Sequence, residues 1–282
     1  MIATGARARR WPEARGVHVL RSVEDALALR AASRRARRVA IVGAGFVGSE
    51  VAATLRSLGV AVTLIDVAPR PLMPLGALAG EAVARMHAER GVTLRLGRRV
   101  AGVARERVLL AGGERIDADV VLVALGAAPC TDWLEGSGLT LRDGVVVDAF
   151  GFADEARRIV AAGDVAVGPH PLAGGEPVAI RHWSNAAERA PIVAGNLLAG
   201  ADGGECVARA PVPSVWSDQY EVKIQAAGFP HLADRETLAD EDARRLALAW
   251  RGDRLVGAVG FNRARDVARL RRELAAPAVP SP

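Results

Sequence analysis

IVGAGFVGSE, at residues 41–50, leads from an apolar strand through a G-x-G-x-x-G turn into the start of a helix. Gly43 permits the tight turn, Gly45 lets the backbone approach phosphate groups, and Gly48 lets the helix pack closely on the strand. The N-terminus of that helix, with Phe46 and Val47 in its first turn, would then face an anion. The order of these residues predicts a binding site for the pyrophosphate of a dinucleotide.

The residues around the turn complete a βαβ unit. An apolar strand is expected at 39–42, a helix at 51–58 and a second strand at 61–65, which runs into Asp66. A carboxylate there accepts hydrogen bonds from the adenosine ribose and repels a 2′-phosphate, so Asp66 favours NAD(H) over NADP(H). NADP(H) remains the alternative cofactor, because the guanidinium of Arg70 could pair with that phosphate. The complete βαβ context disfavours the alternative, a turn without a ligand in which Asp66 caps a turn.

Composition and charge exclude several classes of function. Half of the 282 residues are hydrophobic, mean hydropathy is +0.16, and no apolar run approaches the ~18 residues of a membrane span. The opening residues, MIATGARARRWP, contain no apolar core of a signal peptide, so a cytoplasmic location without a membrane partner is expected. The net charge of +5 comes almost entirely from arginine, and aromatic residues are only 4%, which argues against a nucleic-acid partner.

Cysteine and histidine patterns predict neither a redox pair nor a metal site. Cys130 and Cys206 lie far apart without a C-x-x-C spacing, and we interpret them as small, half-buried residues of a reducing compartment. No H-x-x-H spacing occurs among the five histidines, which are His18, His87, His170, His182 and His231. Trp11, Trp133 and Trp250 are interpreted as packing residues.

Alternating strands and helices predict an α/β fold with a doubly wound nucleotide-binding domain. The expected strands lie at 17–20, 39–42, 61–65, 92–96 and 120–125, with a hairpin about Gly112-Gly113, and the expected helices at 22–37, 51–58 and 78–90. The continuous apolar run at 120–125 is typical of a buried parallel strand.

The second half of the chain changes in character. It is rich in Gly, Pro and Ala up to residue 204, where we expect a strand at 159–162 and a helix at 185–198. Strands at 222–226, 246–250 and 255–260 with a helix at 264–274 then predict a small antiparallel sheet covered by a terminal helix.

Five further motifs stand in a fixed order around the nucleotide fold. They are ATGARARR at 3–10, VALGAAPCTDWLEGSGL at 123–139, VAAGDVA at 160–166, HWSNA at 182–186 and VWSDQYEVKIQAAG at 215–228. Together they resemble the NADH-dependent ferredoxin reductases of oxygenase systems, of the putidaredoxin reductase type, within the glutathione-reductase-like flavoproteins. The resemblance covers nearly the whole chain.

The resemblance implies two cofactors, FAD and NAD(H), and four segments. Residues 1–16 would be a remnant of an FAD domain, 17–127 an inserted Rossmann-like NAD domain, 128–208 the second part of the FAD domain, and 209–282 a small α+β interface domain. The fold class it implies is therefore α/β, with a doubly wound NAD domain inserted in an incomplete FAD domain.

The resemblance also assigns residues to the flavin. The carboxylate of Asp164, which follows the small residue Gly163, would accept a hydrogen bond from a ribityl hydroxyl, although a cap of a turn or helix is the alternative. Thr4, Gly5 and Arg7 match the segment that lines the phosphate and adenine side of the flavin.

Two further matches concern the flavin ring. His182, Trp183 and Asn185 match a helix start near the pyrimidine end, where the helix dipole would stabilise negative charge on reduced flavin. Trp216, with the Ser-Asp-Gln that follows it, resembles the segment that approaches the ring, although ordinary core packing is the alternative.

Two residues are matched to the nicotinamide side. Gly126 corresponds to the loop that faces the nicotinamide, although any strand-ending glycine would look the same. Glu50 resembles an acidic position near the nicotinamide and flavin, and an exposed or capping role is equally compatible with the sequence.

The sequence departs from the family at its start. Family members open with their own strand, G-x-G-x-x-G turn and helix for the ADP half of FAD, and no such segment precedes Ala3. A βαβ unit of ~30 residues or more is therefore expected to be absent. We expect this chain by itself to hold FAD weakly and to expose strand edges. A truncated, non-catalytic NAD-binding remnant is the alternative.

The activity implied by the resemblance is hydride transfer from NADH to FAD, followed by single electrons to an iron–sulfur protein such as an acidic [2Fe–2S] ferredoxin. No side chain is assigned as catalytic, since the flavin carries the chemistry. An NADH oxidase or a nitrite-reductase-type flavoprotein shares the same core. A flavin disulfide reductase would need a C-terminal His-Glu pair, which His231 does not provide.

Overall fold

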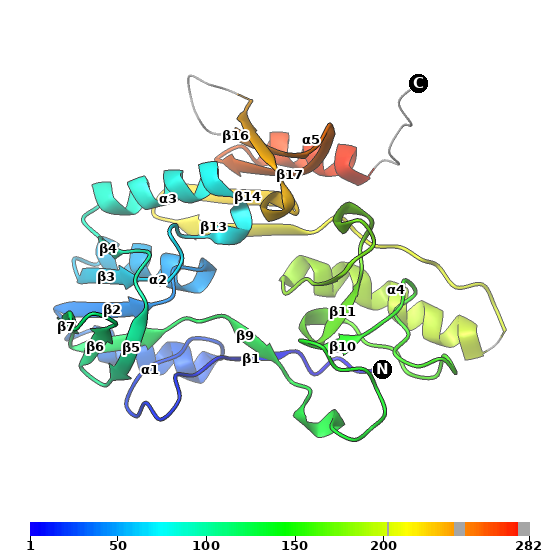
Figure 1. Cartoon of the computed structure of the whole chain (residues 1–282), viewed down its shortest axis with the longest axis horizontal. Helices are drawn as coiled ribbons and strands as arrows, with labels where there is room; N and C mark the ends of the chain where they lie inside the picture. The colour runs from blue at the N-terminus through cyan, green and yellow to red at the C-terminus, as the bar shows by residue number, and fades with distance from the viewer. Residues whose placement is uncertain (202, 240–245, 276–282) are drawn as a thin grey trace. The chain divides into compact units, whose positions relative to one another are not determined.

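The computed structural model describes residues 1–201, 203–239 and 246–275 of the chain. They fall into two compact units (Figure 1). Unit 1 comprises Met1–Arg7, Ala128–Trp216 and Gln225–Pro282, and unit 2 comprises Ala8–Ala127 and Ser217–Ile224.

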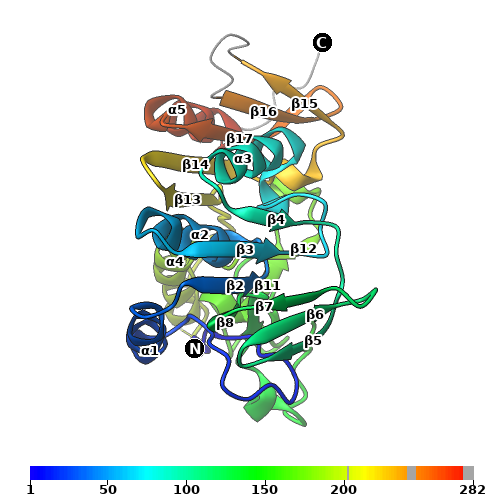
Figure 2. The ribbon, with the colours of Figure 1, turned by 90° about the vertical axis from the view of Figure 1, so that its left-hand side faces the viewer.

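Unit 2 is built on a parallel sheet with the strand order β4-β3-β2-β8 (Figure 2). Its strands are β2 (Arg38–Val42), β3 (Ala61–Ile65), β4 (Thr93–Arg95) and β8 (Val120–Val123). Ile41 of the central strand pairs with Leu64 on one side and Leu122 on the other. All four residues of β8 are buried, which explains why its sequence is continuously apolar rather than alternating.

The two faces of this sheet are covered differently. Val39 and Ile41 face the helical side, where they pack with Leu29 and Leu55. The helices of unit 2 are α1 (Val23–Ser33), α2 (Phe46–Ser57) and α3 (Ala77–Glu89). Ala40, Val42 and Ile65 face the other side and pack against a small antiparallel sheet of β5 (Val100–Ala104), β6 (Arg107–Leu110) and β7 (Arg115–Asp117).

Two larger sheets and two α-helices make up most of unit 1 in the part of the chain that the structure describes. The first sheet is β10 (Val145–Val146), β11 (Ala166–Pro169) and β12 (Pro177–Ala179), followed in sequence by α4 (Trp183–Ala201). The second has the order β13-β14-β17-β16-β15, from β13 (Ser214–Gln219), β14 (Val222–Gly228), β15 (Arg235–Leu238), β16 (Leu246–Arg251) and β17 (Arg254–Phe261). The end of β13 and the start of β14, within Ser217–Ile224, belong to unit 2. The last helix, α5 (Ala264–Ala275), packs on this second sheet through Val267, Leu270 and Leu274.

Most predicted elements of the nucleotide fold are confirmed, with shifted ends. Ser22 caps α1 through a capping box with Asp25, as its position predicted, but the helix ends at Ser33 instead of Arg37. The reason is that the carboxylate of Asp119 accepts the backbone N–H groups of Arg37 and Arg38, which draws these residues out of the helix.

Several local predictions are wrong. Residues 159–162 form no strand, because only single bridges hold them, between Ala161 and Ile2 and between Val160 and Phe152. Residues 17–20 likewise make one bridge, between His18 and Leu122. Strand β5 was not expected, since glycine interrupts its sequence.

The tryptophan predictions hold for two of the three residues. Trp133 is not a packing residue, because it is 62% exposed and its Nε1 donates to the carbonyl of Cys130. Trp11 packs at the edge of the unit 2 core, and Trp250 is half-buried with its Nε1 donating to Thr237. Both cysteines are half-buried and free.

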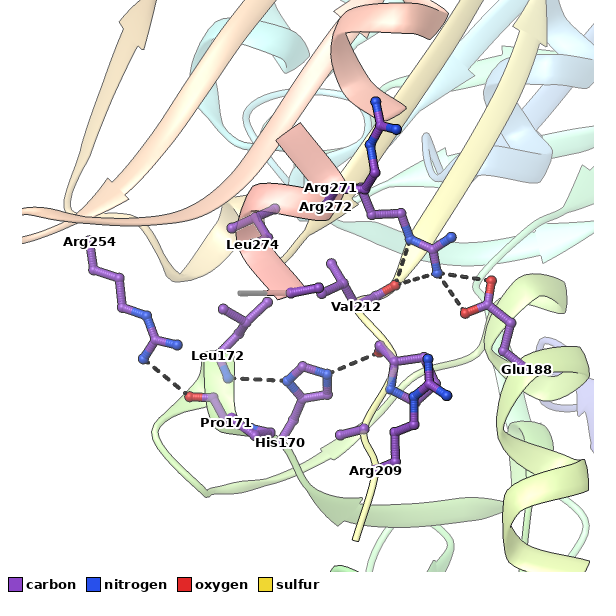
Figure 3. Close-up of a pocket in the computed structure, with 13 residues that line it drawn as sticks. His170, Pro171, Leu172, Glu188, Arg209, Val212, Arg254, Arg271, Arg272 and Leu274 are labelled. Carbon is purple, nitrogen blue, oxygen red and sulfur yellow. Dashed lines mark hydrogen bonds and ion pairs between the residues drawn. The ribbon is translucent and has the colours of Figure 1, made fainter. Parts of the chain in front are cut away.

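Arg271 connects α5 to two other segments of unit 1 (Figure 3). Its Nη2 donates to both carboxylate oxygens of Glu188, at 2.9 and 2.6 Å, and Nε and Nη2 donate to the carbonyl of Val212, at 2.9 and 2.6 Å. These groups line a cavity of about 590 Å³ with His170. Since Nδ1 of His170 accepts the amide of Leu172, its Nε2 carries the proton and donates to the carbonyl of Pro211.

We predict that Arg271→Ala lowers the free energy of unfolding by about 1 to 2 kcal/mol, because it removes charge-assisted bonds to a carboxylate and a main-chain carbonyl. Arg269→Ala on the same helix is the matched control: its pair with Glu273 is half-exposed on both sides, and a loss of less than about 0.5 kcal/mol is expected. Urea unfolding of the two variants measures the difference. Equal losses would contradict this role of Arg271.

Candidate functional site

The glycine turn between β2 and α2 is shaped by close backbone contacts. Gly43 has φ of +110°, and a Cβ there would collide with the carbonyl of Ala124. A Cβ on Gly48 would collide with the carbonyl oxygen of Gly43, so the helix begins with its backbone directly against the turn. Gly45 differs from both, because nothing lies within 4 Å of where its Cβ would be.

Gly45 is the N-cap of α2 and has no side chain to fill the space in front of the helix. The first-turn amides of an α-helix lack acceptors within the helix, and its dipole is positive at this end. Phe46 and Val47 begin the helix, and Val47 is exposed. This arrangement gives an anion access to the main chain, which fits a pyrophosphate.

Asp66 fastens the glycine turn to the end of β3. Its Oδ2 accepts the amide of Ala44 at 2.6 Å and its Oδ1 accepts the amide of Ala68 at 2.8 Å. The turn-capping role that the sequence left as the alternative is therefore present in the fold. A carboxylate has about four lone-pair sites, so two acceptor positions of Asp66 take no hydrogen bond from the described residues. Nε of Arg70 is buried and has no hydrogen-bond partner among the described residues.

Glu50 lies in the second turn of α2 and is half-buried, so neither an exposed nor a capping role describes it. Its Oε1 accepts a hydrogen bond of 2.7 Å from the hydroxyl of Ser217. Burial raises the pKa of Glu50, the Ser217 hydrogen bond opposes that rise, and the charge of Asp218 adds to it. Gly126, which follows β8, has φ of +77° and open space at its Cβ position.

Within unit 1, one group of the residues matched to the flavin lies around the start of α4. Gly163 and Asp164 form a 3-10 turn in which no side chain acts as the cap, and a Cβ on Gly163 would lie 3.6 Å from that of Ala186. Burial lowers the pKa of His182, and the charge of Asp164 opposes this shift. Asn185 donates from Nδ2 to the carbonyl of Ile180, 3.1 Å away.

Two tryptophans of unit 1 present large exposed rings. Trp183 is 75% exposed and Trp216 is 47% exposed, so core packing is the wrong interpretation of Trp216. Their ring centroids lie 6.2 Å apart at an interplanar angle of 75°. An exposed aromatic pair of this kind suits a planar ligand or a partner surface.

The segment at the N-terminus is held by the loop after β9. The hydroxyl of Thr4 donates to the carbonyl of Cys130, and the amide of Cys130 donates to the carbonyl of Gly5, each at 2.9 Å. Arg7 forms an exposed ion pair of 2.8 Å with Asp132. The strands involved are β1 (Ala6–Ala8) and β9 (Ala127–Pro129), which pair with each other.

Sequence reasoning missed a buried polar cluster next to Glu50. Ser217 and Gln219 are fully buried on β13, and His87 on α3 is also fully buried, with its Nδ1 3.0 Å from the hydroxyl of Tyr220. The resemblance had matched Ser217 and Gln219, together with Trp216, to the segment that approaches the flavin ring, and it did not predict their contact with Glu50. Among the described residues no group of three or more His, Cys, Asp or Glu side chains could hold a metal ion.

Across residues 1–201, 203–239 and 246–275, every helix is too short or too polar to cross a bilayer.

Comparison with known proteins gives matches along the whole chain. Residues 1–190 match the family described as pyridine nucleotide-disulphide oxidoreductase, and residues 214–282 match the one described as reductase C-terminal. The ferredoxin–NAD(+) reductase component of the anthranilate 1,2-dioxygenase system of Burkholderia cepacia is 39% identical over 298 residues, covering 100% of this chain and 71% of that protein.

Two further matches agree with it. Rhodocoxin reductase of Rhodococcus erythropolis is 32% identical and covers 98% of this chain and 66% of that protein. The reductase in the covalent putidaredoxin reductase–putidaredoxin complex superposes with a TM-score of 0.86 at 29% identity, covering 97% of this chain and 68% of that one. The chain thus spans about two thirds of the length of these relatives.

We predict opposite outcomes for two glycine substitutions in the turn. Gly45→Ala keeps the thermal stability, because φ of −73° suits alanine and its Cβ meets no atom, but it weakens NADH binding by about 10-fold or more by filling the approach to the phosphates. Gly48→Ala lowers the free energy of unfolding by about 3 kcal/mol or more, because its Cβ meets a main-chain carbonyl. Thermal melts and NADH fluorescence titrations test both. Unchanged affinity in Gly45→Ala would contradict the assigned phosphate site.

Proposed function

The chain belongs to the pyridine nucleotide-disulphide oxidoreductase family, and on this basis we propose that it acts as an FAD-dependent reductase that passes electrons from NADH to an iron–sulfur protein. The observation that carries the proposal is the 39% identity to a ferredoxin–NAD(+) reductase component along the entire chain, through the C-terminal reductase segment. The open glycine turn and the exposed tryptophan pair are consistent with the two cofactors that this reaction needs.

We propose the following roles for unit 2. The first turn of α2, with Gly43, Gly45 and Gly48, holds the pyrophosphate of NADH by its main-chain amides and dipole. The free acceptor positions of Asp66 orient the adenosine ribose. Asp66 follows β3 and Gly126 follows β8, on opposite sides of β2, so we assign the nicotinamide half to the side of Gly126. Glu50 is assigned to the nicotinamide on the resemblance alone.

We propose that FAD is held by Thr4, Gly5, Arg7, Gly163, Asp164, His182, Trp183, Asn185 and Trp216 of unit 1. When bound, FAD accepts two electrons from NADH as a hydride and releases them one at a time. The chain's own groups bind and orient: the carboxylate of Asp164 accepts a ribityl hydroxyl, and the N-terminus of α4 stabilises negative charge beside it. The exposed ring of Trp216 is suited to shield the flavin from water.

The segment assignment is part of the proposal. Residues 1–16 and 128–208 are assigned to the FAD domain, 17–127 to the NAD domain and 209–282 to an interface domain. The separate family match that begins at residue 214 supports a boundary near 209. The proposed electron acceptor is an acidic [2Fe–2S] ferredoxin, which the net charge of +5 supports in sign, and the proposed location is the cytoplasm, where NADH is generated.

The decisive experiment is reduction of cytochrome c by NADH, catalysed by the chain supplied with FAD, with and without an acidic [2Fe–2S] ferredoxin. We expect the rate to rise at least ~10-fold with ferredoxin and to fall as salt is added, because the charges that steer the two proteins together are screened. A rate independent of ferredoxin would support an NADH oxidase instead. NADH binding without any flavin binding would support a non-catalytic nucleotide-binding protein.

Cofactor preference provides a separate test of Asp66. We expect kcat/KM for NADH to exceed that for NADPH by about 10-fold or more, because Asp66 repels a 2′-phosphate. Asp66→Asn removes the charge at constant size and should reduce this ratio, whereas Arg70→Ala should leave it unchanged. A ratio that rises in Arg70→Ala would show instead that Arg70 binds the 2′-phosphate.

A further inference from the structure

We propose that Ser217 is a positioning residue for Glu50: its hydroxyl, fixed in direction by Gln219, holds one carboxylate oxygen of Glu50 and leaves the other oxygen directed to the bound nicotinamide. This inference rests on the proposed function, which assigns the nicotinamide to the side of Glu50. All the residues that carry it belong to unit 2.

The direction of each hydrogen bond follows from the groups involved. Nε2 of Gln219 can only donate, and it lies 3.1 Å from the hydroxyl oxygen of Ser217, which therefore accepts. The one hydroxyl proton of Ser217 is then left to donate to Oε1 of Glu50, 2.7 Å away. Ser217 and Gln219 are 0% exposed, so water does not compete for these bonds. Oε1 is thereby an obligatory acceptor, and a proton on Glu50 would reside on the other oxygen.

The buried groups on the other side of Gln219, away from Glu50, are consistent with the same orientation of its amide. Oε1 of Gln219 and Nε2 of His87 are both buried, and neither has a hydrogen-bond partner in the described part of the chain. Burial lowers the pKa of His87 to about 4, and Gln219 opposes this shift. His87 is therefore neutral at physiological pH. A proton on its Nε2 would face the amide oxygen of Gln219, and Nδ1 would accept the hydroxyl proton of Tyr220. The ring of Tyr220 is in turn covered by Arg90, 4.5 Å from its centroid.

Period-two alternation along β13 separates this cluster from its neighbours. Ser217 and Gln219 point to one face, whereas Trp216 and Asp218 lie on the other and are exposed. Among the described residues, Asp218 is the charged group that acts on Glu50, and it lies 3.9 Å from Lys223. Ser217 is thus the group that favours the ionised form of Glu50 against burial and the charge of Asp218.

This positioning has a chemical consequence for the two forms of the nucleotide. The ring of NAD⁺ carries a positive charge and that of NADH does not. An ionised, fixed Glu50 therefore stabilises bound NAD⁺ and leaves bound NADH nearly unaffected. Ser217 would set the pH range over which the site distinguishes the product from the substrate.

The first test measures the pKa of Glu50 in the cofactor-free chain by NMR titration of its side-chain carboxyl carbon, assigned with Glu50→Gln. Ser217→Ala is expected to raise this pKa by about one unit, because the hydrogen bond to the ionised form is lost. Ser57→Ala is the matched control, since that hydroxyl donates to the carbonyl of Ala53 on the same helix, and no shift is expected. An unchanged pKa in Ser217→Ala overturns the proposal.

The second test compares NAD⁺ and NADH binding by titration at pH values between the two pKa values of Glu50. In Ser217→Ala the affinity for NAD⁺ should fall by about 3- to 10-fold while that for NADH stays within about twofold. Equal losses for both nucleotides would indicate a merely structural role and overturn the proposal. Ser217→Thr, which restores a hydroxyl, should recover the NAD⁺ affinity.

Two further comparisons keep the result interpretable. If Ser217→Ala does not fold, as judged by its thermal melt, Gln219→Leu replaces it and should raise the pKa of Glu50 by a smaller amount, because the Ser217 hydroxyl remains but can rotate. If the unsubstituted chain binds neither nucleotide, the proposed function fails, whereas the shift of the Glu50 pKa still decides whether Ser217 positions that carboxylate.

Discussion

The close approach of α2 to the end of β2 is the constraint on which unit 2 depends. The carbonyl oxygen of Gly43 occupies the place that a side chain on Gly48 would need, so the helix can begin directly at the turn only because both positions are glycine. The turn is then fastened from β3, where the amide of Gly43 donates to the carbonyl of Ile65 and Asp66 accepts the amide of Ala44. This fixes the direction of α2, and with it the place of Glu50 one turn further along.

Features set by residues close together in the sequence could be predicted from it, whereas contacts between residues far apart in the sequence could not. The glycine turn, the parallel strands and the cap at Ser22 follow from local rules, and each is present. The hydrogen bond between Glu50 and Ser217 joins residues 167 positions apart, and no sequence pattern in either segment predicts it. The prediction of a strand at 159–162 was wrong for a related reason. An apolar run becomes a strand only when a neighbouring segment pairs with it along its length, and residues 159–162 make only single bridges.

Arginine accounts for most of the positive charge, and the structure shows that part of it has an internal use. Arg271 bonds the carbonyl of Val212, and Arg56 donates to the carbonyls of Arg90 and Val60. A guanidinium satisfies main-chain acceptors in this way because its five donors have fixed directions. The net charge therefore overstates the electric field that could steer an acidic partner. Only the guanidinium groups that are not bonded within the fold contribute fully to that field.

Strand β13 shows how a short segment can carry two unlike tasks. Its alternation directs Ser217 and Gln219 into a buried polar cluster and exposes Trp216 and Asp218 on the opposite face. A slip of one residue would exchange the two sets, placing an indole where Glu50 needs a hydroxyl donor and burying a carboxylate beside another one. Both errors are costly, because they leave buried polar groups without partners. The register of this strand is therefore determined by its polar residues as strongly as by its apolar ones.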